Sequence, residues 1–227
     1  MIRAIVFDFD GLIVDTEGPI FKVWQRIYRE HHQELPRERW LTIIGTASGS
    51  FDPVVDLGDR LGATLEKEEF DRLERLYYRE ATIAQRLLPG VDDYLRAAKR
   101  LGLKTAIASS SRRQWVMDHL ARFDIHGHFD AIVCREDVVR TKPDPALYLM
   151  AVERLGVEPL DAIALEDSSN GLRAAKAAGL FCVAVPNVMT AEMDLTAADL
   201  QIDSLASVRL DELVQRAEQT ANERAQP

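Results

Sequence analysis

Two carboxylates lie two positions apart directly after an apolar run near the start of the chain. The run covers residues 2–7 and is followed by Asp8, Phe9, Asp10 and Gly11. Side chains two positions apart project to the same side of a strand, so Asp8 and Asp10 would share one small volume where Gly11 lets the backbone turn. Paired carboxylates repel, and the pair is tolerable where a divalent cation neutralises one and the other holds a proton. The alternative is a loop with two solvated acids, but the apolar strand and the glycine favour the metal site.

A serine run follows a second apolar segment. Residues 104–108 read as a strand, and Ser109, Ser110 and Ser111 come directly after it. Ser111 and Gln114 have the spacing of a capping box, which predicts a helix start. A hydroxyl and backbone N–H groups at a helix start form an anion site suited to phosphate. If Ser111 is only the helix cap, Ser109 and the amide of Ser110 are the better phosphate ligands.

A lysine stands before a further predicted helix. Lys142 precedes Pro143, with Asp144 as the expected N-cap and Pro145 in the first turn. Most lysines are simply solvated. Here the prolines fix the chain direction, and an ammonium is the group that would hold both an ionised Asp8 and a phosphate.

Two adjacent acids, Glu166 and Asp167, follow the apolar residues 162–165. Opposite Asp8 and Asp10, they would complete an oxygen-rich site of the kind that Mg²⁺ prefers. The five histidines lie away from these strand ends and show no ligand spacing with the cysteines, which argues against zinc.

The elements that must position these residues alternate along the second part of the chain. The patterns predict strands over residues 104–108, 131–134, 162–165 and 181–185, and helices over residues 92–100, 112–123, 145–155 and 169–178. Alternation with near-continuous apolar strands predicts an α/β fold, a Rossmann-like parallel sheet with helices on both faces. Ligands on such sheets bind at the carboxyl ends of the strands.

Between the first strand and Leu88 the periodicity is helical and strand-like runs are nearly absent. Punctuation at Gly18-Pro19 and Pro89-Gly90 predicts a helical cap domain, residues 17–87, on a core of residues 1–16 and 88–227. The alternative is that these helices simply pack on the sheet. The polar tail, residues 215–227, is expected to fray.

Composition limits the partners. The chain has 227 residues, 47% hydrophobic and 29% charged, and a net charge of −9, which argues against binding to nucleic acid or to an anionic membrane. No apolar stretch is long enough to span a membrane, and the apolar start is too short for a secretory signal. Cys134 and Cys182 are expected to be reduced core thiols of a cytoplasmic protein. A monomer or weak homodimer is expected.

These elements, in order, resemble the haloacid dehalogenase-like hydrolase superfamily, in the phosphatase and β-phosphoglucomutase-like branch with a helical cap after the first motif. The matching motifs are Asp8 to Glu17, then Ser109, then Lys142-Pro143, then Glu166-Asp167. The resemblance implies that Asp8 attacks phosphorus and becomes an aspartyl phosphate, and that Asp10 serves as general acid and then as general base. It also implies Mg²⁺ bound by Asp8, the Asp10 carbonyl and Asp167, with Glu166 in or just outside the ligand shell. Ser109 and Lys142 would hold the phosphoryl oxygens.

The resemblance leaves two activities open, that of a phosphatase and that of a β-phosphoglucomutase. An acid at Asp10 favours phosphoryl transfer over dehalogenation, and the leading expectation is a phosphatase of a small phosphorylated metabolite, such as a sugar phosphate. β-Phosphoglucomutases share a tryptophan matching Trp24, but their cap histidine and basic cap-loop residue have no match here. Trp24, Gly45 and Thr46 are therefore expected to contact the substrate without gripping a second phosphate. A non-catalytic phosphometabolite sensor is disfavoured, because a sensor needs no nucleophile.

Overall fold

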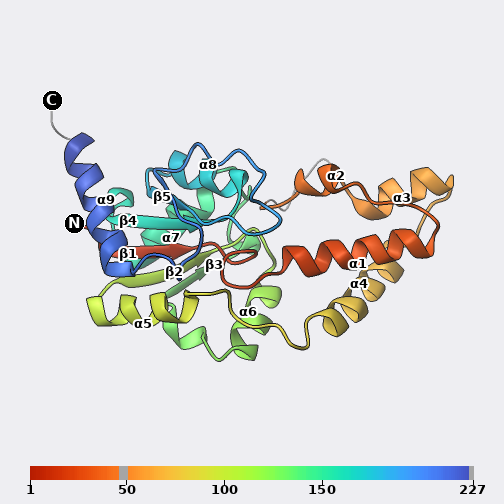
Figure 1. Ribbon diagram of the computed structural model, residues 1–227, viewed down its shortest axis with the longest axis horizontal. Coiled ribbons are helices and arrows are strands. Elements are labelled where there is room, and N and C mark those ends of the chain that lie inside the picture. The colour runs from red at the N-terminus through yellow and green to blue at the C-terminus, as the bar shows by residue number, and fades with distance from the viewer. Residues whose placement is uncertain (46–50, 225–227) are drawn as a thin grey trace.

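A computed structural model describes residues 1–45 and 51–224 of the chain, and its centre is one parallel sheet. The sheet has six strands in the order β3-β2-β1-β4-β5-β6 (Figure 1). The strands are β1 (Ala4–Phe7), β2 (Lys104–Ala108), β3 (Ala131–Val133), β4 (Ala162–Glu166), β5 (Phe181–Ala184) and β6 (Leu200–Gln201). The predicted α/β class is confirmed. The two-residue edge strand β6 was not predicted, because a segment this short has no periodicity to read.

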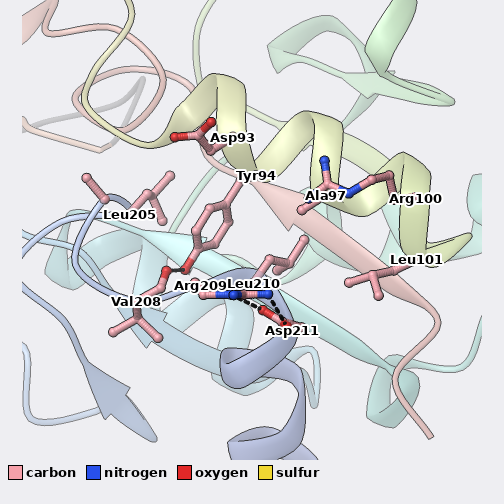
Figure 2. Close-up of a pocket in the computed structure, with 11 residues that line it drawn as sticks. Asp93, Tyr94, Ala97, Arg100, Leu101, Leu205, Val208, Arg209, Leu210 and Asp211 are labelled. Carbon is pink, nitrogen blue, oxygen red and sulfur yellow. Dashed lines mark hydrogen bonds and ion pairs between the residues drawn. The ribbon is translucent and has the colours of Figure 1, made fainter.

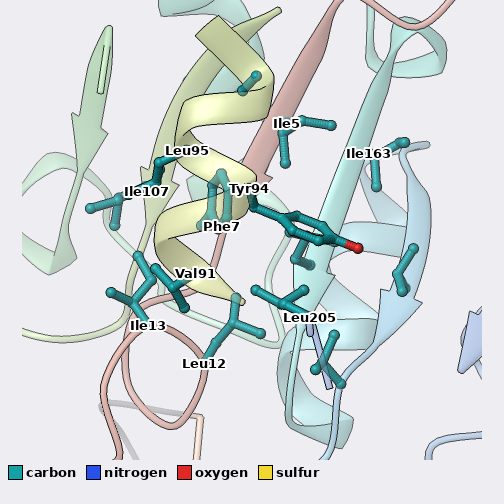
Figure 3. Close-up of a cluster of buried hydrophobic side chains, with 14 of the residues drawn as sticks. Ile5, Phe7, Leu12, Ile13, Val91, Tyr94, Leu95, Ile107, Ile163 and Leu205 are labelled. Carbon is teal, nitrogen blue, oxygen red and sulfur yellow. The ribbon is translucent and has the colours of Figure 1, made fainter. Parts of the chain in front are cut away.

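Helices cover both faces of this sheet. They are α5 (Val91–Leu101), α6 (Arg113–Arg122), α7 (Ala146–Leu155), α8 (Ser169–Ala177) and α9 (Leu210–Arg224). Alternate residues of β1 point to opposite faces: Ile5 and Phe7 pack with α5, α6 and α9, whereas Ala4 and Val6 pack with α7 and α8. Figure 3 shows the first of these clusters, in which Tyr94 and Leu95 of α5 lie against the strands. All four β1 side chains are fully buried, so the strand that carries Asp8 is held from both sides.

The remaining helices lie beyond the carboxyl ends of the strands, on one side of the molecule (Figure 1). They are α1 (Glu17–Glu30), α2 (Arg37–Leu41), α3 (Pro53–Leu61) and α4 (Lys67–Ala81), and we call them the cap helices. They share an apolar cluster that includes Trp24, Ile27 and Phe70. Polar contacts join this region to the core: Asn170 Nδ2 of α8 donates at 3.0 Å to the carbonyl of Ile44, which follows α2, and Arg37 of α2 donates at 2.9 Å to the carbonyl of Val188 in a core loop.

The C-terminal segment departs from the sequence prediction. It was expected to fray from residue 215, but α9 continues to Arg224. Leu210, Leu213 and Ala217 recur at helical spacing and are buried against the α5 face of the sheet. This apolar stripe holds the helix in place despite its many charged residues.

A cavity of about 510 Å³ lies between α5 and the start of α9 (Figure 2). Tyr94 lines it, and its hydroxyl donates to the Val208 carbonyl at 2.8 Å. None of the residues predicted to do chemistry lines this cavity.

Within the described part of the chain, no helix is both long and apolar enough to cross a membrane. Cys134 and Cys182 are buried free thiols.

Candidate active site

The candidate site forms where three neighbouring strands end. β1 pairs with β2 on one side and β4 on the other, with Phe7 opposite both Ile107 and Leu165. The residues that follow therefore meet at one edge of the sheet: Asp8 after β1, Ser109 after β2, and Asp167 after β4. The Asp8 N–H donates to the Leu165 carbonyl at 2.9 Å, which carries the pairing one residue beyond β1.

Lys142 joins two buried carboxylates at this edge. Its Nζ lies 2.5 Å from Asp8 Oδ1 and 2.6 Å from Glu166 Oε1. The lysine and Glu166 are fully buried, and Asp8 is 4% exposed. Burial and the Glu166 charge raise the pKa of Asp8 to about 8 although Lys142 opposes the shift. Burial lowers the pKa of Lys142, but Asp8 and Glu166 outweigh it and keep the ammonium charged.

The Glu166 carboxylate is saturated by protein donors. Tyr148 donates its hydroxyl to Oε1 at 2.6 Å beside Lys142, and the Ser168 hydroxyl donates to Oε2 at 3.2 Å. Gly171 passes so close that an added Cβ would lie 1.9 Å from the carboxyl carbon. Glu166 thus has the contacts of a group that fixes Lys142.

Asp167 has a free oxygen. Its Oδ2 accepts from Asn187 Nδ2 at 2.7 Å, whereas its buried Oδ1 has no hydrogen-bond partner among the described residues. Burial and the neighbouring carboxylates Asp8 and Glu166 raise the pKa of Asp167 well above its usual range. One oxygen from each of these three acids lies within 4.8 Å of the others. A buried acceptor without a donor, among carboxylates that repel, fits a cation such as Mg²⁺.

Asp10 accepts hydrogen bonds from four described side chains. Thr16 Oγ1 and Trp115 Nε1 donate to Oδ1 at 2.9 and 2.8 Å. Ser111 Oγ and Ser109 Oγ donate to Oδ2 at 2.6 and 3.4 Å. Ser111 therefore does not cap α6. The N-cap is Arg112, and the predicted capping box is wrong because Ser111 uses its hydroxyl on Asp10.

Of the cap residues expected to contact the substrate, Trp24 and Gly45 lie in different environments. Trp24 is 2% exposed in the cap cluster, and its indole N–H donates to Glu74 at 2.7 Å, so it packs the cap rather than facing the strand ends. Gly45 lies against the core, where its carbonyl accepts from Ser110 Oγ at 3.2 Å. Thr46 falls outside the described residues. The N-cap of α7 is Pro145 and not Asp144 as predicted, because α7 begins one residue later; Asp144 still accepts from the Ala146 N–H at 3.1 Å.

Several residues of the site were missed. Asn187 follows β5 and carried the same signal as the other strand-end polar residues. Glu17 was used only as part of a motif. It lies at the start of α1, where desolvation together with the charges of Asp10 and Asp8 raises its pKa to about 8. Trp115 gave no signal, because one tryptophan on an amphipathic helix reads as core.

The sheet, the insertion after β1 and the strand-end cluster define the class: a Rossmann-like α/β enzyme with a helical insertion. The chain belongs to the haloacid dehalogenase-like hydrolase family, whose model matches residues 5–185.

Three similar proteins cover nearly the whole chain. YhcW of Bacillus subtilis (strain 168), named as a candidate phosphatase, is 43% identical over 210 residues, 92% of this chain and 95% of that protein. Hexitol phosphatase B of Escherichia coli (strain K12) is 32% identical over 220 residues, 94% of this chain and 97% of its own. A crystal structure of β-phosphoglucomutase from Clostridium difficile has a TM-score of 0.79 at 25% identity, covering 98% of this chain and all of that one (100%). The expected superfamily and hydrolase class are confirmed.

Proposed function

We propose that the protein is a magnesium-dependent phosphatase that hydrolyses a small phosphorylated sugar or sugar alcohol through an aspartyl phosphate on Asp8. The observation that carries the proposal is the buried Asp8–Lys142–Glu166 chain beside the unpartnered Oδ1 of Asp167. Such an arrangement keeps one carboxylate available for attack while neighbouring positive charge offsets its burial.

In the first half-reaction, an Asp8 oxygen forms a bond to phosphorus as the bond from phosphorus to the leaving oxygen breaks. Lys142, fixed by Glu166, balances charge at Asp8 and at the phosphoryl oxygens, and the Ser109 hydroxyl and the Ser110 amide bind those oxygens. Asp10 gives its proton to the leaving oxygen. In the second half-reaction Asp10 takes a proton from the water that attacks phosphorus, which releases phosphate and restores Asp8.

The cation would be held by Asp8, the Asp10 backbone carbonyl and the free Oδ1 of Asp167. When bound, Mg²⁺ supplies positive charge that offsets repulsion between the carboxylates and the phosphate. We place Glu166 outside the ligand shell, because both of its oxygens already accept from protein donors.

The substrate class rests on the similar proteins and on the cap helices. Hexitol phosphatase B carries a sugar alcohol in its name, so we place the substrate among hexose or hexitol phosphates. Residues 17–87 act as a cap domain that contacts the leaving group, with Gly45, whose carbonyl accepts from Ser110, at the contact. The buried free thiols Cys134 and Cys182 are compatible with the reducing cytoplasm.

A β-phosphoglucomutase-like transferase is the second candidate, favoured by the likeness to that enzyme's structure. A mutase must grip a second phosphate with cationic groups of the cap. Two cap cations are already engaged: Arg37 pairs with Glu192 at 2.9 Å, and Arg39 pairs with Asp56 at 2.5 Å. This engagement supports the phosphatase.

A phosphate-release screen over hexose, hexitol and other metabolite phosphates tests the proposal, with Asp8→Asn as the inactive control. Wild type should release phosphate, lose activity in chelator and regain it with Mg²⁺, and Asp8→Asn should be inactive but folded. Release by folded Asp8→Asn at the wild-type rate would overturn the covalent mechanism.

For the mutase, β-glucose 1-phosphate with trace glucose 1,6-bisphosphate should give inorganic phosphate or no reaction. Rapid formation of glucose 6-phosphate without phosphate release would reverse the choice.

A further inference from the structure

The two oxygens of Asp10 have different environments. Oδ1 accepts from the indole N–H of Trp115 at 2.8 Å and from the hydroxyl of Thr16, which is fully buried. Oδ2 faces Ser109 and Ser111, the serines that follow β2 on the side of the expected phosphate site. Oδ1 therefore points into the protein, and Oδ2 points toward the expected phosphate site.

Trp115 decides which oxygen can carry a proton. An indole N–H donates and cannot accept, so the oxygen that faces it must be an acceptor. A hydroxyl can reverse its role by rotation, and the three serine and threonine partners therefore impose no such restriction. A proton on Oδ1 directed at the Trp115 N–H would place two donors head to head, which leaves Oδ2 as the protonated oxygen.

Trp115 is itself held between the core and the cap helices. It packs against the core cluster that contains Phe9 and against the cap cluster that contains Tyr78 of α4. The Trp115 ring centroid lies 5.0 Å from that of Tyr78 and 4.3 Å from that of His119 on α6. His119 Nε2 lies 3.3 Å from the Tyr78 hydroxyl, and its Nδ1 lies 2.9 Å from the Trp115 carbonyl. The indole orientation thus depends on a helix of the cap being in place.

We infer that Trp115 is a positioning residue for the acid step: it confines the transferable proton of Asp10 to Oδ2 and aims that oxygen at the leaving group. This inference rests on the proposed role of Asp10 as general acid. The Oδ2 proton goes to the leaving oxygen as the bond from that oxygen to phosphorus breaks, and Oδ1 stays bound to the indole throughout. Tyr78 and His119 act through Trp115, so the acid is aligned only when α4 lies against α6.

The test compares two substrates that differ in their need for an acid. p-Nitrophenyl phosphate releases a phenolate that leaves without protonation, whereas sorbitol 6-phosphate, or the alkyl phosphate turned over fastest in the screen, releases an alkoxide that needs the proton. Trp115→Phe keeps a ring and removes the N–H. Because general acid catalysis is worth about 100-fold to 10,000-fold, partial misalignment should lower kcat/KM for the alkyl phosphate by about tenfold or more and for the aryl phosphate by less than about threefold.

A matched control uses the same change elsewhere. Trp24 also donates its indole N–H to a carboxylate, that of Glu74 inside the cap, at 2.7 Å. Trp24→Phe should leave the ratio of the two kcat/KM values unchanged. An equal loss on both substrates, or no loss, in Trp115→Phe would overturn the inference. Asp10→Asn tests the general-acid role on which the inference rests: if this variant hydrolyses the alkyl phosphate like wild type, that role of Asp10 fails, whereas the phosphatase activity itself is tested by the phosphate-release screen.

A second measurement keeps the inference open to refutation if Trp115→Phe does not fold. The three tryptophans give three indole N–H signals in proton NMR, assigned with Trp24→Phe and Trp40→Phe. A hydrogen bond to a charged carboxylate is stronger than one to an amide, so Asp10→Asn should move the Trp115 signal upfield more than the other two. An unmoved Trp115 signal would show that the bond to Asp10 is absent in solution.

Discussion

Replacing Lys142 with methionine should destabilise the protein by an amount that grows with pH. The lysine is fully buried and bridges Asp8 and Glu166 at 2.5 and 2.6 Å. Removing one partner of a buried ion pair typically costs about 3 to 5 kcal/mol, because the remaining charge is left without compensation. Methionine keeps nearly the length of the side chain, so the loss reports the charge rather than a cavity.

The pH dependence follows from proton uptake. Asp8 already has a folded-state pKa near 8, against 3.8 ordinarily, so between these values it carries a proton in the folded wild type that it lacks in the unfolded chain, and its contribution lowers stability as pH rises. Without the ammonium, a further carboxylate of the cluster takes up a proton on folding. Each extra proton adds a slope of about 1.4 kcal/mol per pH unit, so the loss should grow by about 2 kcal/mol between about pH 6 and about pH 7.5.

Urea denaturation in chelator, followed by circular dichroism at these two pH values, measures the loss. Lys99→Met on the exposed face of α5 is the matched control and should stay within about 0.5 kcal/mol of wild type. A loss below about 1 kcal/mol at about pH 7.5, or an equal loss at both pH values, would refute the assignment of Lys142 as the buried counter-charge.

Three other changes probe the same edge of the sheet. Gly171→Ala should lower the free energy of unfolding by about 1 to 3 kcal/mol in urea denaturation, because the added Cβ would lie 1.9 Å from the Glu166 carboxyl group. The stabilisation that alanine usually gives over glycine in a helix would contradict this close approach. Asn187→Ala should weaken Mg²⁺ binding by about 10-fold to 100-fold in calorimetry, since Asn187 orients Asp167; an unchanged affinity would mean that Asp167 needs no support. The Mg²⁺ affinity of the wild type should rise with pH through about 8, and protons should be released on binding, because Asp8 must ionise to bind the cation. Calorimetry in two buffers of different ionisation enthalpy measures both effects. A pH-independent affinity without proton release would count against this prediction.

The strand-end residues could be predicted because a parallel sheet leaves little choice. Asp8, Ser109 and Asp167 each follow an apolar run, and once the runs are read as neighbouring strands their ends must converge. Lys142 was predicted from its ammonium group and from the prolines that fix the chain direction beside it, and the structure places it between Asp8 and Glu166. The sequence did not predict that Glu166 and Asp167 make different contacts. The difference depends on Tyr148 and Ser168, which donate to Glu166 and leave Oδ1 of Asp167 without a partner among the described residues.

Trp115 shows where sequence reasoning ends. On a helix, its position beside Val116 and before Leu120 gives it the periodicity of an ordinary core residue. Its contact with Asp10 depends on how α6 is rotated and on Tyr78 arriving from the cap helices, which no local pattern encodes. The same limit applies to Trp24, for which the resemblance implied a substrate contact: the hydrogen bond from its indole N–H to Glu74 is encoded by no local pattern.

The central place of β1 has a consequence for synthesis of the chain on the ribosome. β1 emerges first, yet its two hydrogen-bonded neighbours are β2 and β4, which are made much later. The cap helices have their own apolar cluster and can associate in the interval, while the β1 residues wait for both partners. A chain that stops before β4 presents an unpaired apolar edge, the kind of segment that aggregates, and it lacks Glu166 and Asp167. Catalytic competence therefore arrives late in translation, after the cap helices have had time to form.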